Sequence, residues 1–255
     1  MPWSERRSME CQKCGDERKR RCCIISQQEK TDRHKEGIFA EAPFVHPFRS
    51  PTNQAQRLRA LQFARAHHAR VLWTVAHDNP VTKEGATKKK VQESWLTLDD
   101  RKTSRMPDFI LLVLDIPIKF TQEPDRGDRL KGVFTNARGR LRGWDLTANE
   151  DARVQQNEEA KLALHDRPVR LYIEMLSANP NLELIDGRRI YTLRQHYKSW
   201  FVDGDNRQVE VKRHGFPIVP DFGGTAHSYC GSSLDACIGD LLGWWQKPQK
   251  EAAVR

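Results

Sequence analysis

The stretch FPIVPDFGGTAHSYCGSSLD, residues 216–235, carries the most informative pattern in this chain of 255 residues. It begins with an apolar segment bounded by Pro217 and Pro220, which predicts a short buried strand. A glycine pair and a polar loop follow, and Ser233-Leu234-Asp235 is typical of a helix start. This order of strand, loop and helix gathers hydroxyl, imidazole and backbone N–H donors, which suit a phosphodiester backbone.

The same stretch resembles motif V of superfamily-one DNA helicases of the RecD and Pif type. The family pattern is approximately T-x-H-K-S/A-Q-G-x-S/T-L/F-D/E. The chain matches it at Thr225, His227, Gly231, Ser233, Leu234 and Asp235. It has Ser228 where the family has lysine and Cys230 where the family has glutamine. In the family these two positions serve DNA contact and communication with the nucleotide site, so both departures bear on coupling to ATP.

Segments further upstream resemble the same family in the same order. Pro51-Thr52-Asn53, the helix and strand that follow, and His77-Asp78 resemble the motif IV region of its second RecA-like domain. Residues 112–118 resemble the L-x-L-x-x-G-x-P-V strand of the family. Two glycine-containing segments resemble a turn of its small SH3-like insertion: 130–132 and 139–144.

The resemblance covers about residues 44–242 and implies the second motor domain of such a helicase with its insertion. It implies that the chain binds single-stranded DNA and has no catalytic residue of its own. The residues implied in that binding are Asn53, Thr225, His227, Ser228, Gly231 and Ser233. The family's first RecA-like domain is expected to precede residue 1, and its arginine-bearing final motif to follow Leu242. The chain is therefore expected to be a truncated, divergent piece, whose partners are single-stranded DNA and the missing domain or another helicase subunit.

Motifs for nucleotide hydrolysis are absent from the sequence. A P-loop has the pattern G-x-x-x-x-G-K-S/T, because its backbone N–H groups cradle the phosphates while the lysine contacts the terminal ones. No Gly-Lys dipeptide occurs in the chain, and neither H-E-x-x-H, G-x-S-x-G nor G-x-G-x-x-G is found. ATP and magnesium are thus expected as cofactors only of a full-length parent, and this chain alone is predicted not to hydrolyse ATP.

The remaining pattern predicts an α/β fold class, with a partial RecA-like domain of the P-loop NTPase type. Ser50 is a candidate N-cap for a helix that extends to about His68, followed by a strand over residues 71–76. The longest apolar stretch, residues 109–118, predicts a single buried strand. The apolar residues of the helix recur at three-residue steps: Ala55, Leu58, Leu61 and Ala64.

A β-rich module is predicted between two parts of this domain. Four glycines within residues 122–146 predict short antiparallel strands joined by tight turns. Further strands are predicted at 169–176, 190–193, 200–202 and 209–211. The predicted organisation is a polar arm over 1–43, the RecA-like domain over 44–120 and 208–247, and the SH3-like insertion over 121–207.

The N-terminal arm has two interpretations, and a third interpretation concerns the chain as a whole. Cys11 and Cys14 are followed by Cys22 and Cys23, with His34 beyond. A tetrahedral zinc ion could take Cys11, Cys14, either Cys22 or Cys23, and His34 as its ligands, although the spacing is irregular and adjacent cysteines are awkward donors to one ion. The chain is then a zinc-stabilised basic module that binds nucleic acid or protein on a degenerate helicase scaffold. Otherwise the arm is a solvated segment with reduced cysteines. A truncated product without an independent role is a third interpretation.

The net charge and composition of the chain indicate which classes of partner it is expected to bind. The chain has 43 Lys and Arg against 34 Asp and Glu, a net charge of +9, and its first 35 residues hold ten basic and six acidic residues. Such an excess favours a polyanion. No apolar stretch reaches the roughly 20 residues that a membrane-spanning helix needs, so no membrane partner is predicted. Six cysteines without a secretory signal predict a reducing, intracellular location, with the nucleus or an organelle included.

Overall fold

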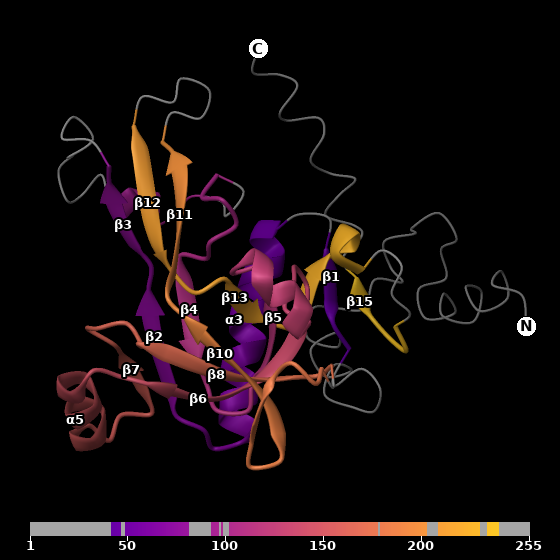
Figure 1. The fold of residues 1–255 in the computed structure, drawn as a ribbon, viewed down its shortest axis with the longest axis horizontal. Coiled ribbons are helices and arrows are strands. Elements are labelled where there is room, and N and C mark those ends of the chain that lie inside the picture. The colour runs from indigo at the N-terminus through magenta and orange to yellow at the C-terminus, as the bar shows by residue number, and fades with distance from the viewer. Residues whose placement is uncertain are drawn as a thin grey trace, which may run out of the picture. The chain divides into compact units, whose positions relative to one another are not determined.

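The structure is a computed structural model that describes residues 42–46, 49–81, 93–96, 98, 102–177, 179–202, 209–229 and 234–239. The chain divides into two compact units, the first of residues 1–42 and 233–238, the second of residues 43–232 and 239–255. Most described residues belong to the second unit. This unit mixes strands and helices as predicted, but strands dominate (Figure 1).

The largest sheet of the second unit has six antiparallel strands. Their order is β13 (Ile218–Pro220), β5 (Pro117–Phe120), β6 (Arg138–Asp145), β8 (Arg170–Met175), β10 (Arg188–Arg194) and β9 (Glu183–Ile185). Alternate residues of β8, namely Leu171, Ile173 and Met175, are buried, because successive side chains of a strand point to opposite faces. Gly139 in β6 lets β8 approach closely, since a Cβ there would lie 2.6 Å from the carbonyl oxygen of Glu174.

Smaller groups of strands complete the second unit. The strands β11 (His196–Phe201), β12 (Glu210–Gly215) and β3 (His77–Pro80) are antiparallel in that order. The strand β2 (Val71–Val75) pairs antiparallel with β4 (Phe109–Leu112) and parallel with β7 (Lys161–Ala163). The strand β1 (Phe44–His46) is parallel to β14 (Gly223–Thr225). The last described strand is β15 (Ile238–Gly239).

The helices connect these groups. They are α3 (Arg49–Ala66), α5 (Ala148–Gln156) and the short 3₁₀ helices η4 (Arg126–Lys131) and η6 (Ala226–Tyr229). The helix α3 contacts β1, β13 and β14. A main hydrophobic core includes Ala60 of α3, Phe120 of β5 and Leu141 of β6. A second, smaller cluster contains Trp95 and Trp200 with Val211 of β12.

The buried face of α3 differs from the prediction. Thr52, Gln56, Ala60 and Ala64 are buried at four-residue steps, whereas Leu58 has 55% of its surface exposed. Of the predicted row at three-residue steps, Ala64 is buried and Leu61 packs against the main core, whereas Leu58 is exposed. With 3.6 residues per turn, a four-residue step stays closer to one face than a three-residue step does. Two polar side chains of α3 therefore face the protein interior.

Two further expectations need correction. Helix α3 begins at Arg49, so Ser50 lies within the helix and is not its N-cap. The apolar stretch 109–118 is not one strand: β4 and β5 are separated by a turn in which Asp115 has a φ of 63°. Aspartate tolerates this left-handed conformation better than most residues, and it lets the chain reverse between two buried strands. Residues 122–146 contain η4 and the single strand β6 rather than several short strands.

The strands predicted at 169–176 and 190–193 correspond closely to β8 and β10. Those predicted at 200–202 and 209–211 overlap only the last two residues of β11 and the first two residues of β12. Strands from both sides of the predicted boundary at residue 120 pair with each other, since β5 pairs with β6 and β2 with β7. The domain boundaries stay predictions.

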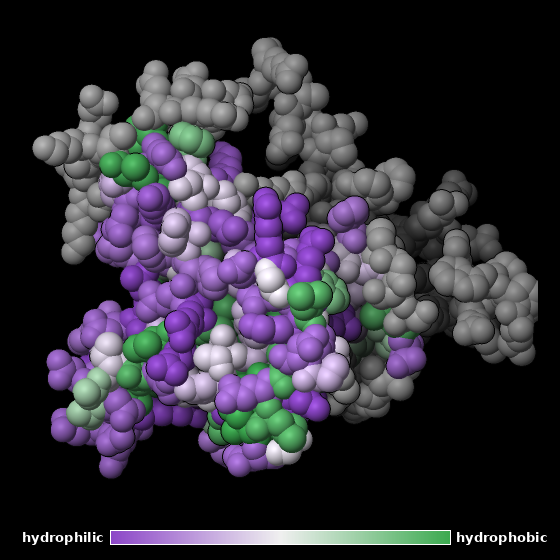
Figure 2. Space-filling view, viewed as in Figure 1, coloured by the Kyte–Doolittle hydropathy of each residue, from purple (hydrophilic) through white to green (hydrophobic). Residues whose placement is uncertain are grey.

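The surface shown in Figure 2 is mostly hydrophilic, with hydrophobic colour in several separate places. The strands β9 and β10 form a hairpin. Asp186 and Gly187 form the turn of this hairpin with φ of 49° and 74°, the left-handed pair typical of a type I′ turn. Leu184 of β9 is exposed. Among the helices that the structure describes, none combines the length and apolarity needed to cross a membrane.

Candidate functional site

Two glycines shape the segment between β13 and η6. Gly223 of β14 lies opposite Phe44 of β1, and a Cβ on Gly223 would lie 2.5 Å from the carbonyl oxygen of Phe44. A Cβ on Gly224 would collide with Ser228 Oγ and would lie 2.8 Å from the ring of Tyr229. Glycine at both positions therefore lets β14 lie against β1 and lets η6 fold back over its own strand.

Helix α3 holds this segment through side chains that donate to its backbone. The Gln56 amide donates to the carbonyl oxygen of Gly223 at 2.5 Å, and Arg59 donates to that of Phe222 at 3.1 Å. The ammonium group of Lys119, on β5, donates to the same Gly223 oxygen. This segment, residues 221–229, is called the β14–η6 loop, and it is fixed to both the helix and the six-stranded sheet.

A cavity of about 220 Å³ lies beside this loop. It is lined by four of the six residues that the sequence predicted for nucleic-acid binding: Asn53, Thr225, His227 and Ser228. Asn53 comes from α3, while the other three come from β14 and η6. Ser228 Oγ donates to the carbonyl oxygen of Thr225 at 2.6 Å, which closes the turn of η6. The structure therefore brings the motif IV-like and motif V-like segments to one cavity.

The chemistry of this lining is polar and basic. Lys119, Arg105 and His227 line the cavity, and its described lining residues include no aspartate or glutamate. Most other lining side chains carry a hydroxyl or an amide, including Thr52 and Gln56 on the buried face of α3. A concave surface with positive charge and neutral hydrogen-bond donors favours an anionic ligand.

Two residues that are not among the described lining residues, Asp221 and Tyr229, contact the ammonium group of Lys119. Lys119 is 8% exposed, and its Nζ lies 3.4 Å from Asp221 Oδ1 and 5.5 Å from the ring centroid of Tyr229. Arg138 contacts the same two residues, with Nε 2.9 Å from Asp221 Oδ2 and Cζ 5.6 Å from the Tyr229 ring. Burial raises the pKa of Asp221, and the neighbouring charges of Lys119 and Arg138 oppose that shift. Asp221 itself is not part of the cavity lining.

Tyr229 gives this cluster a measurable pH dependence. Burial raises the pKa of Tyr229 to about 12, and the nearby charge of Asp221 adds to the shift. The folded-state pKa lies above the value of about 10 in an unfolded chain, so the stabilisation is complete below pH 10 and is lost as the pH rises through about 12. We expect the difference in free energy of unfolding between wild type and Tyr229→Phe to change by ~1–2 kcal/mol over this range. Urea unfolding of both proteins at several pH values measures it, and parallel curves for the two would contradict the prediction.

The other predicted site residues are not described by the structure. These are Gly231, Ser233, Cys11, Cys14, Cys22, Cys23 and His34. In the described part of the chain, no group of three or more His, Cys, Asp and Glu side chains is placed to hold a metal ion. The zinc site in the arm stays a prediction.

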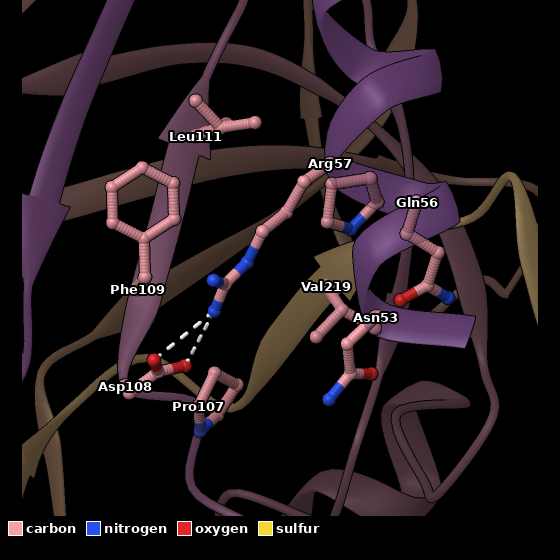
Figure 3. A pocket seen from close by; sticks show the side chains of 9 residues that line it. Asn53, Gln56, Arg57, Pro107, Asp108, Phe109, Leu111 and Val219 are labelled. Atoms are coloured by element: carbon pink, nitrogen blue, oxygen red, sulfur yellow. Dashed lines mark hydrogen bonds and ion pairs between the residues drawn. The ribbon is translucent and has the colours of Figure 1, made fainter. Parts of the chain in front are cut away.

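A second, smaller hollow of about 30 Å³ also adjoins α3 (Figure 3). Asn53, Gln56 and Val219 line both this hollow and the cavity. Figure 3 shows Arg57 extending from α3 to the carboxylate of Asp108, with its Nη2 at 2.8 and 3.1 Å from the two oxygens. The Arg57 side chain is 44% exposed, so this ion pair is accessible to solvent and is not buried.

Sequence reasoning missed Gln56, Lys119 and Arg105 as residues of the cavity. Lys119 carried a signal, because it is a charged residue within the apolar segment Ile118 to Phe120. Gln56 follows Asn53 by three positions, which places both on neighbouring rows of one helix. Nothing in the sequence near Arg105 indicates its position beside the cavity.

No protein-family model and no curated protein matches the chain. Solved structures do resemble it. Pif1 helicase from Candida albicans matches with 12% identity and a TM-score of 0.47, over 84% of this chain and 44% of that protein. Unliganded Pif1 from Bacteroides sp matches with 10% identity and a TM-score of 0.39, over 78% of this chain and 47% of that one. Bacteroides Pif1 bound to ssDNA matches with 11% identity and a TM-score of 0.39, over 78% and 34%. The chain thus spans less than half the length of these Pif1 helicases.

Proposed function

We propose that this chain is a helicase-like fragment that binds single-stranded DNA in the cavity between α3 and the β14–η6 loop and does not hydrolyse ATP alone. One observation carries the proposal: two segments that resemble helicase motifs, far apart in the sequence, line the same cavity. The basic side chains of the lining, with no carboxylate among its described residues, support a polyanionic ligand.

The roles of the lining residues follow from their chemistry. The Thr225 and Ser228 hydroxyls and the His227 imidazole suit phosphate oxygens, while the Asn53 amide can donate to a phosphate or a base edge. His227 is exposed, so a strand can reach it from solvent. Gly231 and Ser233, which continue the same motif, are proposed to add backbone and hydroxyl donors.

The wider organisation belongs to the same proposal. The part over 44–120 and 208–247 is the second RecA-like domain of a divergent helicase of the RecD and Pif type, and 121–207 is its SH3-like insertion. ATP and Mg²⁺ act only when a first RecA-like domain supplies the P-loop. That domain, or another helicase subunit, is then the protein partner.

Binding of a fluorescein-labelled oligothymidylate, followed by anisotropy, tests this function. At low salt we expect the wild-type chain to bind, and His227→Ala to weaken the affinity about fivefold to tenfold, because one hydrogen bond to the strand is lost. His165→Ala is the matched control, since His165 is also exposed and does not line the cavity. We expect no ATP turnover with or without the oligonucleotide.

Two results would overturn the proposal. Absence of affinity for the oligonucleotide at low salt would reject DNA binding. Equal affinities of His227→Ala, His165→Ala and wild type would move binding away from the cavity, in agreement with the alternative of a basic N-terminal module.

A further inference from the structure

One basic residue of the cavity lining, Arg105, lies outside the segments that resemble helicase motifs IV and V. Arg105 lines the cavity from a turn over residues 102–106, which precedes β4. Arg105 is exposed, whereas the next residue, Met106, is fully buried. The turn is therefore anchored at one residue and presents the preceding one at the cavity.

The backbone of this turn adopts an unusual conformation. Ser104 and Arg105 have φ of 53° and 59°, so two consecutive residues with side chains are in the left-handed region. This conformation is costly for residues other than glycine and persists only where surrounding contacts impose it. It sets the direction in which the Arg105 side chain leaves the turn.

Contacts on both sides impose this conformation. Ser104 Oγ donates to the carbonyl oxygen of Ser199 at 2.8 Å, and Thr103 Oγ1 donates to that of Met106 at 3.2 Å. The buried Arg213 donates to the same Met106 oxygen at 3.4 Å. The turn is thus held by β11, by β12 and by itself, and Arg105 projects from a rigid support.

The other side chains of the lining determine which kind of ligand Arg105 would bind in the cavity. Lys119 and His227 line the same cavity, and no carboxylate that would neutralise Arg105 is found among the lining residues that the structure describes. The positive charges of Lys119 and Arg105 on one concave surface attract an anion. A guanidinium presents paired N–H donors that match two phosphate oxygens, which an ammonium group does not.

We propose that the cavity holds one phosphate group of the nucleic-acid strand and that Arg105 is a ligand of this phosphate. The inference rests on the proposed function, and it names a contact from outside the motif-like segments. The phosphate sits between Arg105 and the β14–η6 loop, with Lys119 contributing charge. Arg105 therefore contributes affinity that does not depend on base sequence.

The salt dependence of oligothymidylate binding tests this contact. Losing one phosphate contact to a single strand lowers the slope of log K against log salt concentration by ~0.7. We expect Arg105→Gln to show this smaller slope and about tenfold weaker binding at low salt. Arg105→Lys should restore the slope but only part of the affinity. Arg188→Gln removes the same charge from the β9–β10 hairpin, outside the cavity lining, and should keep the wild-type slope. A wild-type slope in Arg105→Gln would overturn the inference while DNA binding itself stands.

A second measurement separates this contact from the proposed function. Inorganic phosphate should raise the thermal midpoint of the wild type and of Arg188→Gln, and should raise that of Arg105→Gln less. If the wild type does not bind DNA but shows this phosphate effect, the proposed function fails and the phosphate site remains. Equal phosphate effects in wild type and Arg105→Gln would reject Arg105 as a phosphate ligand.

Discussion

Asp78→Ala is expected to lower the free energy of unfolding by about 3–5 kcal/mol, the largest stability effect predicted for this chain. The Asp78 carboxylate accepts from Arg213 Nε at 2.8 Å and from Arg213 Nη2 at 2.7 Å. Their side chains are 3% and 0% exposed. Removal of the carboxylate leaves a guanidinium in the interior without its counter-charge.

The consequence extends beyond the pair itself. Arg213 also donates to the carbonyl oxygens of Trp95 and Met106, and its Cζ lies 5.6 Å from the ring centroid of Trp200. One side chain of β12 therefore joins β3, the 93–96 segment and the turn that carries Arg105. We expect Asp78→Ala to loosen this turn as well as to destabilise the unit.

Urea unfolding of Asp78→Ala, with Asp108→Ala as control, measures the effect. Asp108 pairs with the more exposed Arg57, so its replacement should cost no more than about 1 kcal/mol. The double variant Asp78→Leu/Arg213→Met should be more stable than Asp78→Ala, since no unpaired charge stays buried. If Asp78→Ala and Asp108→Ala were equally stable, the assigned role of the buried pair would be wrong.

Gly224→Ala is expected to weaken oligothymidylate binding more than tenfold, a larger effect than the loss of any single lining side chain. A Cβ at this position would collide with Ser228 Oγ and lie 2.8 Å from the Tyr229 ring and 3.0 Å from Lys119 Nζ. The cavity loop must shift to make room, and overpacking of this kind costs about 1–3 kcal/mol in stability. Thr225, His227 and Ser228 would then move together.

The control for this variant is Gly127→Ala, because a Cβ on Gly127 meets no atom within 4 Å. Anisotropy titrations of both variants, with circular dichroism to verify folding, give the comparison. We expect Gly127→Ala to bind as the wild type does. A folded Gly224→Ala protein with wild-type affinity would show that the β14–η6 loop does not form the binding surface.

The sequence indicated much of the strand pattern but little of the long-range pairing. In β8 and β10 the alternation of apolar residues is local, so it could be recognised directly. The turn at Asp115 was missed because a single polar residue within an apolar stretch also fits a continuous strand. The burial of Thr52 and Gln56 on α3 was missed, because both are polar and a hydrophobic pattern does not include them. Both side chains line the cavity, and Gln56 donates to the backbone of the β14–η6 loop.

Local patterns likewise predicted only part of the candidate site. Asn53, Thr225, His227 and Ser228 were found through local motifs, and they line one cavity in the structure. Lys119 and Arg105 reach that cavity only through tertiary structure. Lys119 does so through the pairing of β5 with β13, and Arg105 through a turn held by β11 and β12. Such positions depend on the register of distant strands, which local patterns do not specify.

Photocrosslinking of the full chain to an oligonucleotide that contains 5-iododeoxyuridine tests the central claim most directly. Proteolysis and mass spectrometry then identify the crosslinked residues. The proposed site predicts crosslinks in 52–57 of α3 and in 221–229 of the β14–η6 loop, which weaken in Gly224→Ala. Crosslinks confined to residues 1–43, unchanged in Gly224→Ala, would contradict binding in the cavity.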